Sequence, residues 1–206
     1  MKKREFLLFC FVCCIISVNA QTIKLENGIS FSKMETNKLN FFTKNFTSYA
    51  NKIGVEYFEH KNFYISSNIG YTKRGGKDKI LIVDTESGEI VSENTISESW
   101  NLLNLNTTFR VKYNFENYIF YLGVGPFVDF LIGTNEFSNS SFETYKAKTV
   151  LGGVCPELGI DYLLTDKILI GLNASSNYSF TPLVKQSILK LNNEQLNIYF
   201  SVGCRL

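Results

Sequence analysis

The chain has 206 residues, of which 45% are hydrophobic and 15% aromatic, and its 21 basic and 19 acidic side chains give a formal net charge of +2. This length fits a single domain. The near-neutral balance argues against a nucleic-acid binder, and the high hydrophobic content with low net charge excludes a disordered chain. Residues 2–5 carry the whole excess of +2, because 18 basic and 18 acidic residues remain after them.

The first twenty residues have the pattern of an export signal. A basic segment (residues 2–4) precedes an apolar one (6–18), and compact residues end the segment at Ala20. A transmembrane anchor is the alternative, but the apolar run is shorter than the roughly 20 residues that span a bilayer. We therefore expect a signal peptide over residues 1–20 that is cleaved after Ala20, and one mature domain over residues 21–206.

The mature chain alternates between apolar and polar residues with the period of two that is typical of β-strands. The clearest case is the segment 117–132, in which every even position from Tyr118 to Ile132 is apolar while the odd positions are mixed. Eight segments show this alternation with varying strength: residues 23–32, 49–59, 63–73, 103–113, 117–132, 147–164, 167–180 and 194–206.

The connections between these segments alternate in length. Short turns fall at residues 59–62, 114–117 and 165–166, and long polar links at 34–48, 74–98, 134–146 and 181–193. Strands joined alternately by tight turns and long loops are the pattern of an outer-membrane barrel, with the short turns in the periplasm. The sequence therefore predicts an all-β fold, an eight-stranded antiparallel up-and-down transmembrane β-barrel of the bacterial outer membrane.

Alternation alone does not say which face points inward, because a soluble lipocalin-like barrel also alternates, with its apolar face inside. Ten of the 14 glycines lie in the predicted strands, and nine of these, all but Gly152, share the polar face. Glycine makes room inside a narrow barrel, and eight strands enclose space only for side chains. We therefore expect the polar face inside and membrane lipid outside, with a soluble lipocalin-like binder as the alternative.

The predicted interior carries five charges of each sign. A filled lumen must pair its charges, because an isolated ion in low dielectric costs several kcal/mol. The opposite face is nearly free of charge in the strand centres, as lipid contact requires. The predicted lumen charge network is Lys24, Lys52, Arg110, Lys112 and Arg205 with Glu26, Glu56, Asp129, Glu157 and Asp161.

Aromatic residues gather near the strand ends, where a membrane barrel places its two aromatic girdles. One group lies near the short turns and a smaller one near the long loops. The first comprises Tyr57, Phe63, Tyr113, Tyr118 and Tyr162, and the second Tyr71 and Trp100.

Three segments resemble the PorT-like outer-membrane β-barrel family. They are Tyr121-Leu-Gly-Val-Gly-Pro-Phe127 with its continuation to Gly133, the segment 103–113, and Gly70-Tyr-Thr-Lys-Arg-Gly75. The resemblance extends over nearly the whole mature chain. It implies an outer-membrane barrel, and PorT itself is linked to protein secretion.

The sequence offers little for catalysis or metal binding. Its one histidine, His60, lies in the first short turn, while a barrel hydrolase needs a histidine beside a nucleophile in a shielded pocket. Cys155 falls on the lumen face and Cys204 on the lipid face, so we expect free thiols and no disulfide. We expect no enzyme, no cofactor and no metal site.

The long link 74–98 is basic at its start and acidic at its end. Residues 80–83 and 89–91 are apolar and flank the turn-like segment 85–88, which indicates a β-hairpin above the membrane. The sequence thus favours a structural or surface-interaction role through the long loops. A secretion or assembly factor, a lipid-modifying enzyme and a soluble binder are the alternatives. We expect a monomer, with the loop partner undefined.

Overall fold

The computed structural model describes residues 21–36, 44–84, 90–135, 148–182, 184–185 and 190–206. The predicted signal peptide and parts of the predicted long links lie outside these residues. The strands are β1 (Thr22–Thr36), β2 (Lys44–Tyr57), β3 (Phe63–Val83), β4 (Ile90–Phe115), β5 (Tyr118–Asn135), β6 (Val150–Leu163), β7 (Ile168–Ser179), β8 (Val184–Lys185) and β9 (Lys190–Arg205).

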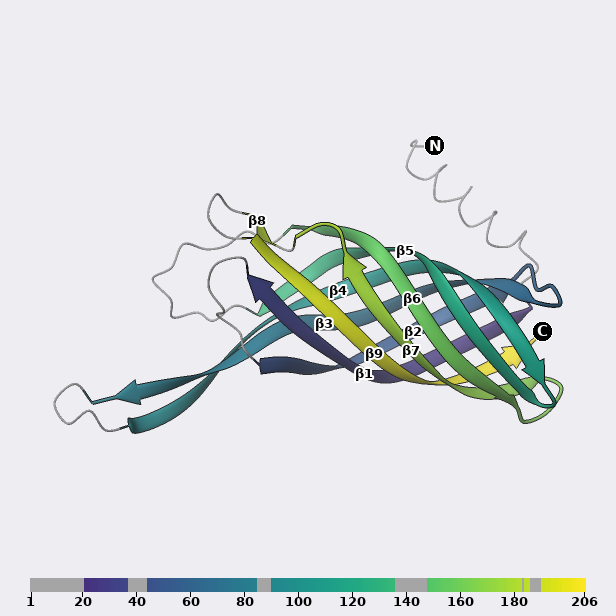
Figure 1. Cartoon of the computed structure of the whole chain (residues 1–206), viewed down its shortest axis with the longest axis horizontal. Helices are drawn as coiled ribbons and strands as arrows, with labels where there is room; N and C mark the ends of the chain where they lie inside the picture. The colour runs from purple at the N-terminus through teal and green to yellow at the C-terminus, as the bar shows by residue number, and fades with distance from the viewer. Residues whose placement is uncertain (1–20, 37–43, 85–89, 136–147, 183, 186–189) are drawn as a thin grey trace, which may run out of the picture.

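The strands form one closed antiparallel barrel. Each strand from β1 to β6 pairs with the next, β7 pairs with β9, and β9 returns to β1 over the register Thr22↔Arg205 to Thr36↔Leu191. The two-residue β8 only extends the edge of β9 at its start. The wall therefore has eight strands, as the sequence predicts, and the first and last of them complete the ring (Figure 1).

The two ends of the barrel differ. The short turns after β2, β4 and β6 lie at the same end as the start of β1 and the C-terminus, while β1, β3, β5 and β7 end toward the other end (Figure 1). Phe58 and Glu116 take left-handed backbone conformations in two of these turns, with φ of 53° and 51°. We call the two ends the short-turn end and the long-loop end.

The strands continue beyond the predicted bounds at the long-loop end. Most of the predicted link 74–98 is strand, because β3 and β4 stay paired from Arg74↔Trp100 to Val83↔Ile90. The sequence correctly indicated a hairpin around residues 85–88. It ended the first strand too early and began the second too late, since alternation weakens where one face no longer contacts a core.

The polar face of the sheet is the inside. Side chains at alternate positions of the barrel strands are buried and mostly polar, while their neighbours are mostly apolar and are exposed or half-buried. At Gly28 an added Cβ would come within 1.9 Å of the Ile198 carbonyl oxygen, and at Gly125 within 1.9 Å of the Thr107 carbonyl oxygen. These contacts confirm that glycine relieves crowding in the barrel.

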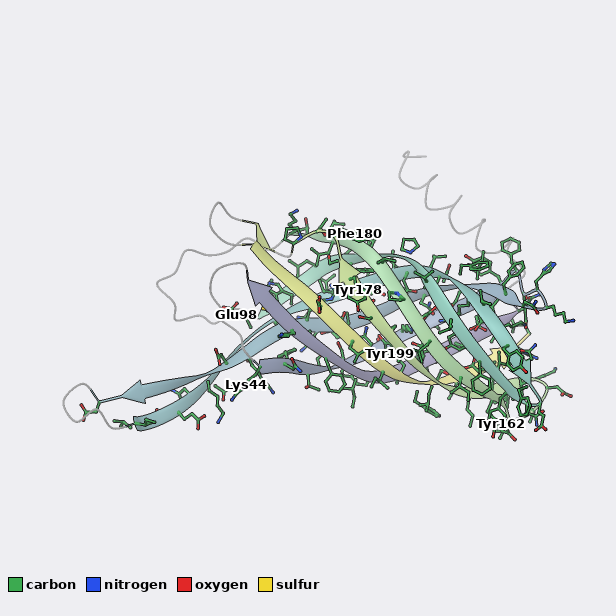
Figure 2. All side chains as sticks on the ribbon, in the orientation of Figure 1. Lys44, Glu98, Tyr162, Tyr178, Phe180 and Tyr199 are labelled. Carbon is green, nitrogen blue, oxygen red and sulfur yellow. The ribbon has the colours of Figure 1, made fainter. Side chains whose placement is uncertain are left out.

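The girdle residues at the short-turn end are exposed or half-buried on the outer surface, and the rings of Tyr118 and Tyr162 lie 5.0 Å apart. At the long-loop end the prediction is wrong for Trp100, which is 4% exposed and points inward. Its place on β4 has the parity of the lumen residues, so the ring fills the barrel. Tyr178 and Phe180 are exposed instead nearer the long-loop end (Figure 2).

Within the described residues we find no helix with the length and apolar character needed to cross a membrane.

Candidate functional site

The lumen brings together the charges that the sequence predicts. Nine of the ten are buried, and Arg205 is half-buried near the short-turn end. They come from six strands, because each strand contributes its inward-facing positions to the same narrow interior. The arrangement is layered along the barrel axis, and each layer has its own ion pairs.

Arg110 on β4 is the centre of the main layer. Its Nε and Nη2 lie 2.6 and 2.9 Å from the two carboxylate oxygens of Glu157, which makes a bidentate pair. Its Nη1 also donates to Glu56 Oε1 at 2.9 Å. Thr108 donates a further hydrogen bond to Glu157. One guanidinium therefore links carboxylates from β2 and β6 across the barrel.

The same layer continues to both sides of Arg110. Lys24 Nζ lies 2.7 Å from Glu56 Oε1 and 2.5 Å from Asp161 Oδ2. On the other side, Lys52 Nζ lies 3.0 Å from Glu26 Oε2 and 3.9 Å from Glu157 Oε2. Seven buried charges thus form one connected chain of ion pairs, which ties β1, β2, β4 and β6 together.

Arg74 is a lumen residue that the sequence reasoning missed. It lies on β3 at 0% exposure, pairs with Asp129, and donates from Nε to Gln195 Oε1 at 2.8 Å. Asn104 Nδ2 donates to Asp129 Oδ1 at 2.5 Å. A signal was present, because Arg74 continues the inward parity of Gly70 and Thr72, but the predicted strand ended at residue 73.

Glu59 is a second missed member. The carboxylate in the first short turn accepts from Lys112 and lies 3.7 Å from Arg205 Nη2. The pair closes the lumen at the short-turn end. Sequence reasoning had assigned this turn to solvent, since a turn carries no alternation that would assign its side chains to a face.

Polar amides and aromatic rings fill the space between the charged layers. Asn68 Nδ2 donates to Asn106 Oδ1 at 2.7 Å, and the Tyr121 ring lies 4.6 Å from the Arg110 guanidinium carbon. A polar cavity of about 10 Å³ beside Lys52 and Tyr199 has room for roughly one water molecule. Side chains therefore occupy the described lumen around these charged layers.

The long-loop end carries the second notable feature, which we call the hairpin arm. It consists of residues 78–83 of β3 and 90–98 of β4, above the last pairings of β3 with β2 (Lys77↔Lys44) and of β4 with β5 (Ser99↔Asn135). Lys44 and Glu98 lie where it leaves the barrel (Figure 2). No strand of the described residues pairs with either of its outer edges.

An ion pair links the two strands of the arm. Lys79 forms an ion pair with Glu93 across the two strands, and this hydrogen-bonded ammonium lowers the pKa of Glu93 below its ordinary value of 4.5. Ile90 and Val91 are 61% and 66% exposed. The arm thus presents backbone edges and apolar side chains to its surroundings.

The remaining candidates lie as the sequence placed them. His60 is exposed in the first short turn, where its ring stacks on Phe63 at 5.1 Å. Cys155 is buried in the barrel and Cys204 is exposed on its outer face, so the two thiols are free. None of these three side chains joins the ion-pair layers.

This geometry of a closed eight-stranded wall, polar inside and apolar outside, has known counterparts. The crystal structure of Neisserial surface protein A superimposes with a TM-score of 0.56 at 11% identity, covering 89% of this chain and 97% of that one. The fold is that of a small outer-membrane β-barrel. The crystal structure of the outer membrane protein OprG from Pseudomonas aeruginosa gives 0.57 at 10% identity, covering 91% and 96%.

The sequence comparisons add no closer relationship. No protein-family model matches the chain. No curated protein matches it either. The likeness to the solved barrels, at 10–11% identity, concerns the fold.

Proposed function

We propose that this protein is a bacterial outer-membrane barrel with a non-conducting lumen, which anchors the hairpin arm and long loops for contact with a partner outside the cell. The observation that carries the proposal is the contrast between a lumen closed by ion pairs and an arm with open edges. A closed lumen leaves no path for transport, while exposed apolar groups above the barrel are typical of an interaction surface. In this proposal the protein is not an enzyme.

The outer surface supports the membrane location. Its exposed apolar residues run along every barrel strand, and lipid contact is the environment in which such a surface is stable. Of the two similar structures, one is named a surface protein and the other an outer membrane protein. The soluble lipocalin-like alternative requires the apolar face inside, which the buried polar lumen contradicts.

Two measurements test the membrane barrel and its closed lumen. Protein extracted from outer membranes should migrate faster on a gel before heating than after it, as a folded barrel does. Reconstituted in planar bilayers, it should give no steady channel currents, because each layer of the lumen is filled by paired side chains. Extraction without detergent, or a sustained open-channel conductance, would contradict the proposal.

The surface role is tested by the arm. Trypsin added to intact cells should cut at Lys77 or Lys79 if the long-loop end faces outward, and should leave Lys167 in a short turn intact. Cells that express a variant with residues 78–97 replaced by a short glycine-serine turn should then adhere less to protein-coated surfaces than cells with the native arm. Equal adhesion with an equal amount of folded barrel would exclude the arm as the contact.

A secretion or assembly role of the PorT-like type is supported only by the resemblance of segments 70–75, 103–113 and 121–127. Deleting the gene tests it: loss of surface proteins from the culture would favour that role, and unchanged secretion would remove it.

A further inference from the structure

The outer surface of the barrel differs between its two walls. On the wall formed by β5, β6, β7 and β9, the outward-facing residues in the middle of the strands are exposed and apolar. This is the surface that hydrocarbon requires. Representative residues of this apolar wall are Leu122, Leu158, Leu172 and Ile198.

The wall formed by β1 to β4 has polar residues at the same positions. Asn27 lies in the middle of the outward row of β1, between Leu25 and Ile29, which are 51% and 49% exposed. Polar groups at membrane depth are rare and expensive because no water satisfies them there. We call this set of outward-facing residues the polar seam: Asn27, Asn51, Ser67 and Thr107.

Hydroxyl groups of the polar seam find partners within their own wall. Ser67 Oγ lies 2.9 Å from both Thr107 Oγ1 and Tyr57 OH. The Tyr49 hydroxyl donates to Asn27 Oδ1 at 2.5 Å. These bonds allow β2, β3 and β4 to carry polar residues without a partner molecule.

The two asparagine amides are not satisfied in this way. Among the described residues, no acceptor receives the Asn27 amide N–H groups, and the Asn51 side-chain amide has no hydrogen bond. The two residues are direct partners in the β1–β2 register, so they lie side by side on the outer face. Donor and acceptor groups therefore point together into the region that lipid would occupy.

We propose that a second copy of this chain docks on the polar seam and forms a two-fold dimer in the membrane. A two-fold axis along the membrane normal exchanges left and right but keeps depth, so Asn27 of one copy faces Asn51 of the other, and the reverse. Each amide carries both a donor and an acceptor, which makes the pair self-complementary. The flanking apolar side chains pack around these bonds, as they do between membrane helices joined by polar residues.

This dimer replaces the monomer that the sequence led us to expect. It rests on the proposed membrane location, because an asparagine amide facing water needs no protein partner. A soluble or lipid partner fits less well. Lipid tails offer no hydrogen-bonding groups, and the polar groups lie at mid-strand, below the level that a soluble protein reaches.

Cysteine crosslinking in native outer membranes tests the dimer. In a Cys204→Ser background, which removes the exposed outer thiol, Asn51→Cys should yield a covalent dimer with a short bifunctional thiol crosslinker, because residue 51 of each copy lies beside the axis, diagonally across from residue 51 of the other. Leu158→Cys is the matched control, since Leu158 is equally outward-facing on β6, on the opposite side of the ring, and 56% exposed. It should stay monomeric under the same conditions.

A second measurement separates a specific contact from random collision. Single-molecule photobleaching in supported bilayers should count two copies per spot, and Asn27→Leu with Asn51→Leu should weaken dimerisation about tenfold. Equal crosslinking at positions 51 and 158, or single-step bleaching of the native protein, overturns the dimer. If the protein still shows heat-modifiable migration on a gel, the membrane barrel itself stands. A protein that leaves the membrane without detergent overturns the proposed membrane function and the dimer together.

Discussion

The strands β3 and β4 pass through two regions that are held together in different ways. Inside the barrel, Arg74 and Arg110 form ion pairs with carboxylates of three other strands, β2, β5 and β6. Both outer edges of the strand pair are hydrogen-bonded to neighbours there. In the hairpin arm, no third strand of the described part of the chain pairs with these two. The comparison shows that backbone pairing between two strands is not enough to make a region of this protein stable, since an isolated two-stranded ribbon is only marginally stable in water.

The largest effect should follow from breaking the main layer of the lumen. Arg110→Met removes the cation that pairs with Glu157 and Glu56. Glu157 then loses its bidentate partner, and Glu56 keeps only Lys24. We expect a loss of about 3–5 kcal/mol in the free energy of unfolding. Urea unfolding in lipid vesicles measures it. The matched arm variant Lys79→Ala should leave the same transition unchanged, and an equal loss in both would erase the distinction between the regions.

A smaller effect should follow from crowding the barrel wall. Gly28→Val forces a side chain against the Ile198 carbonyl oxygen and should cost about 1–3 kcal/mol. Gly152→Ala is the control, because its added Cβ would meet nothing closer than the Phe127 carbonyl oxygen at 3.8 Å. It should change stability by no more than about 0.5 kcal/mol. If Gly152→Ala cost more stability than Gly28→Val, the glycine contacts would not determine how the barrel wall packs.

Replacing the arm should leave the barrel almost untouched. A variant in which a short glycine-serine turn replaces residues 78–97 keeps every ion pair of the lumen. We expect its heat-modifiable migration and urea midpoint to match the native protein within about 0.5 kcal/mol. A large drop in the midpoint would mean that the arm and the barrel unfold as one unit.

The smallest effect concerns the pH dependence of the arm. The pKa of Glu93 is lowered in the folded arm, so its pair with Lys79 stabilises the ribbon above pH 4.5 and loses this contribution as the pH falls through the folded pKa. Hydrogen exchange of the arm amides, corrected for intrinsic rates, should speed up on acidification. Lys79→Ala should remove that change, and a pH response unaffected by the substitution would assign it to other groups.

The sequence predicts the barrel well because period-two alternation reports directly on the two sides of a sheet. Lys24, Arg110 and Glu157 were assigned to the interior from their parity alone, and the structure places all three there at 4% exposure or less. Parity says nothing about which charges meet. The partners of Arg110 depend on the stagger between strands, which a single sequence does not reveal.

The errors have one cause in common. Arg74 and Trp100 face each other in the β3–β4 register beyond the predicted ends of those strands. Loop-like composition around them, with glycines and many charges, ended the predicted strands too early. Extending the first strand by one residue and beginning the second three residues earlier would have placed both side chains inside.

The closure of the ring by β1 and β9 also has a consequence for the order in which the protein forms. The contact between Gln195 and Ser30 joins positions 165 residues apart, and Lys24 meets Asp161 across 137 residues. β1 leaves the ribosome first, yet one of its edges stays open until the last strand arrives. Contacts of such sequence separation make folding slow. That edge of β1 is paired only when β9 forms, so the lumen charges of β1 gain their full set of partners in the final step.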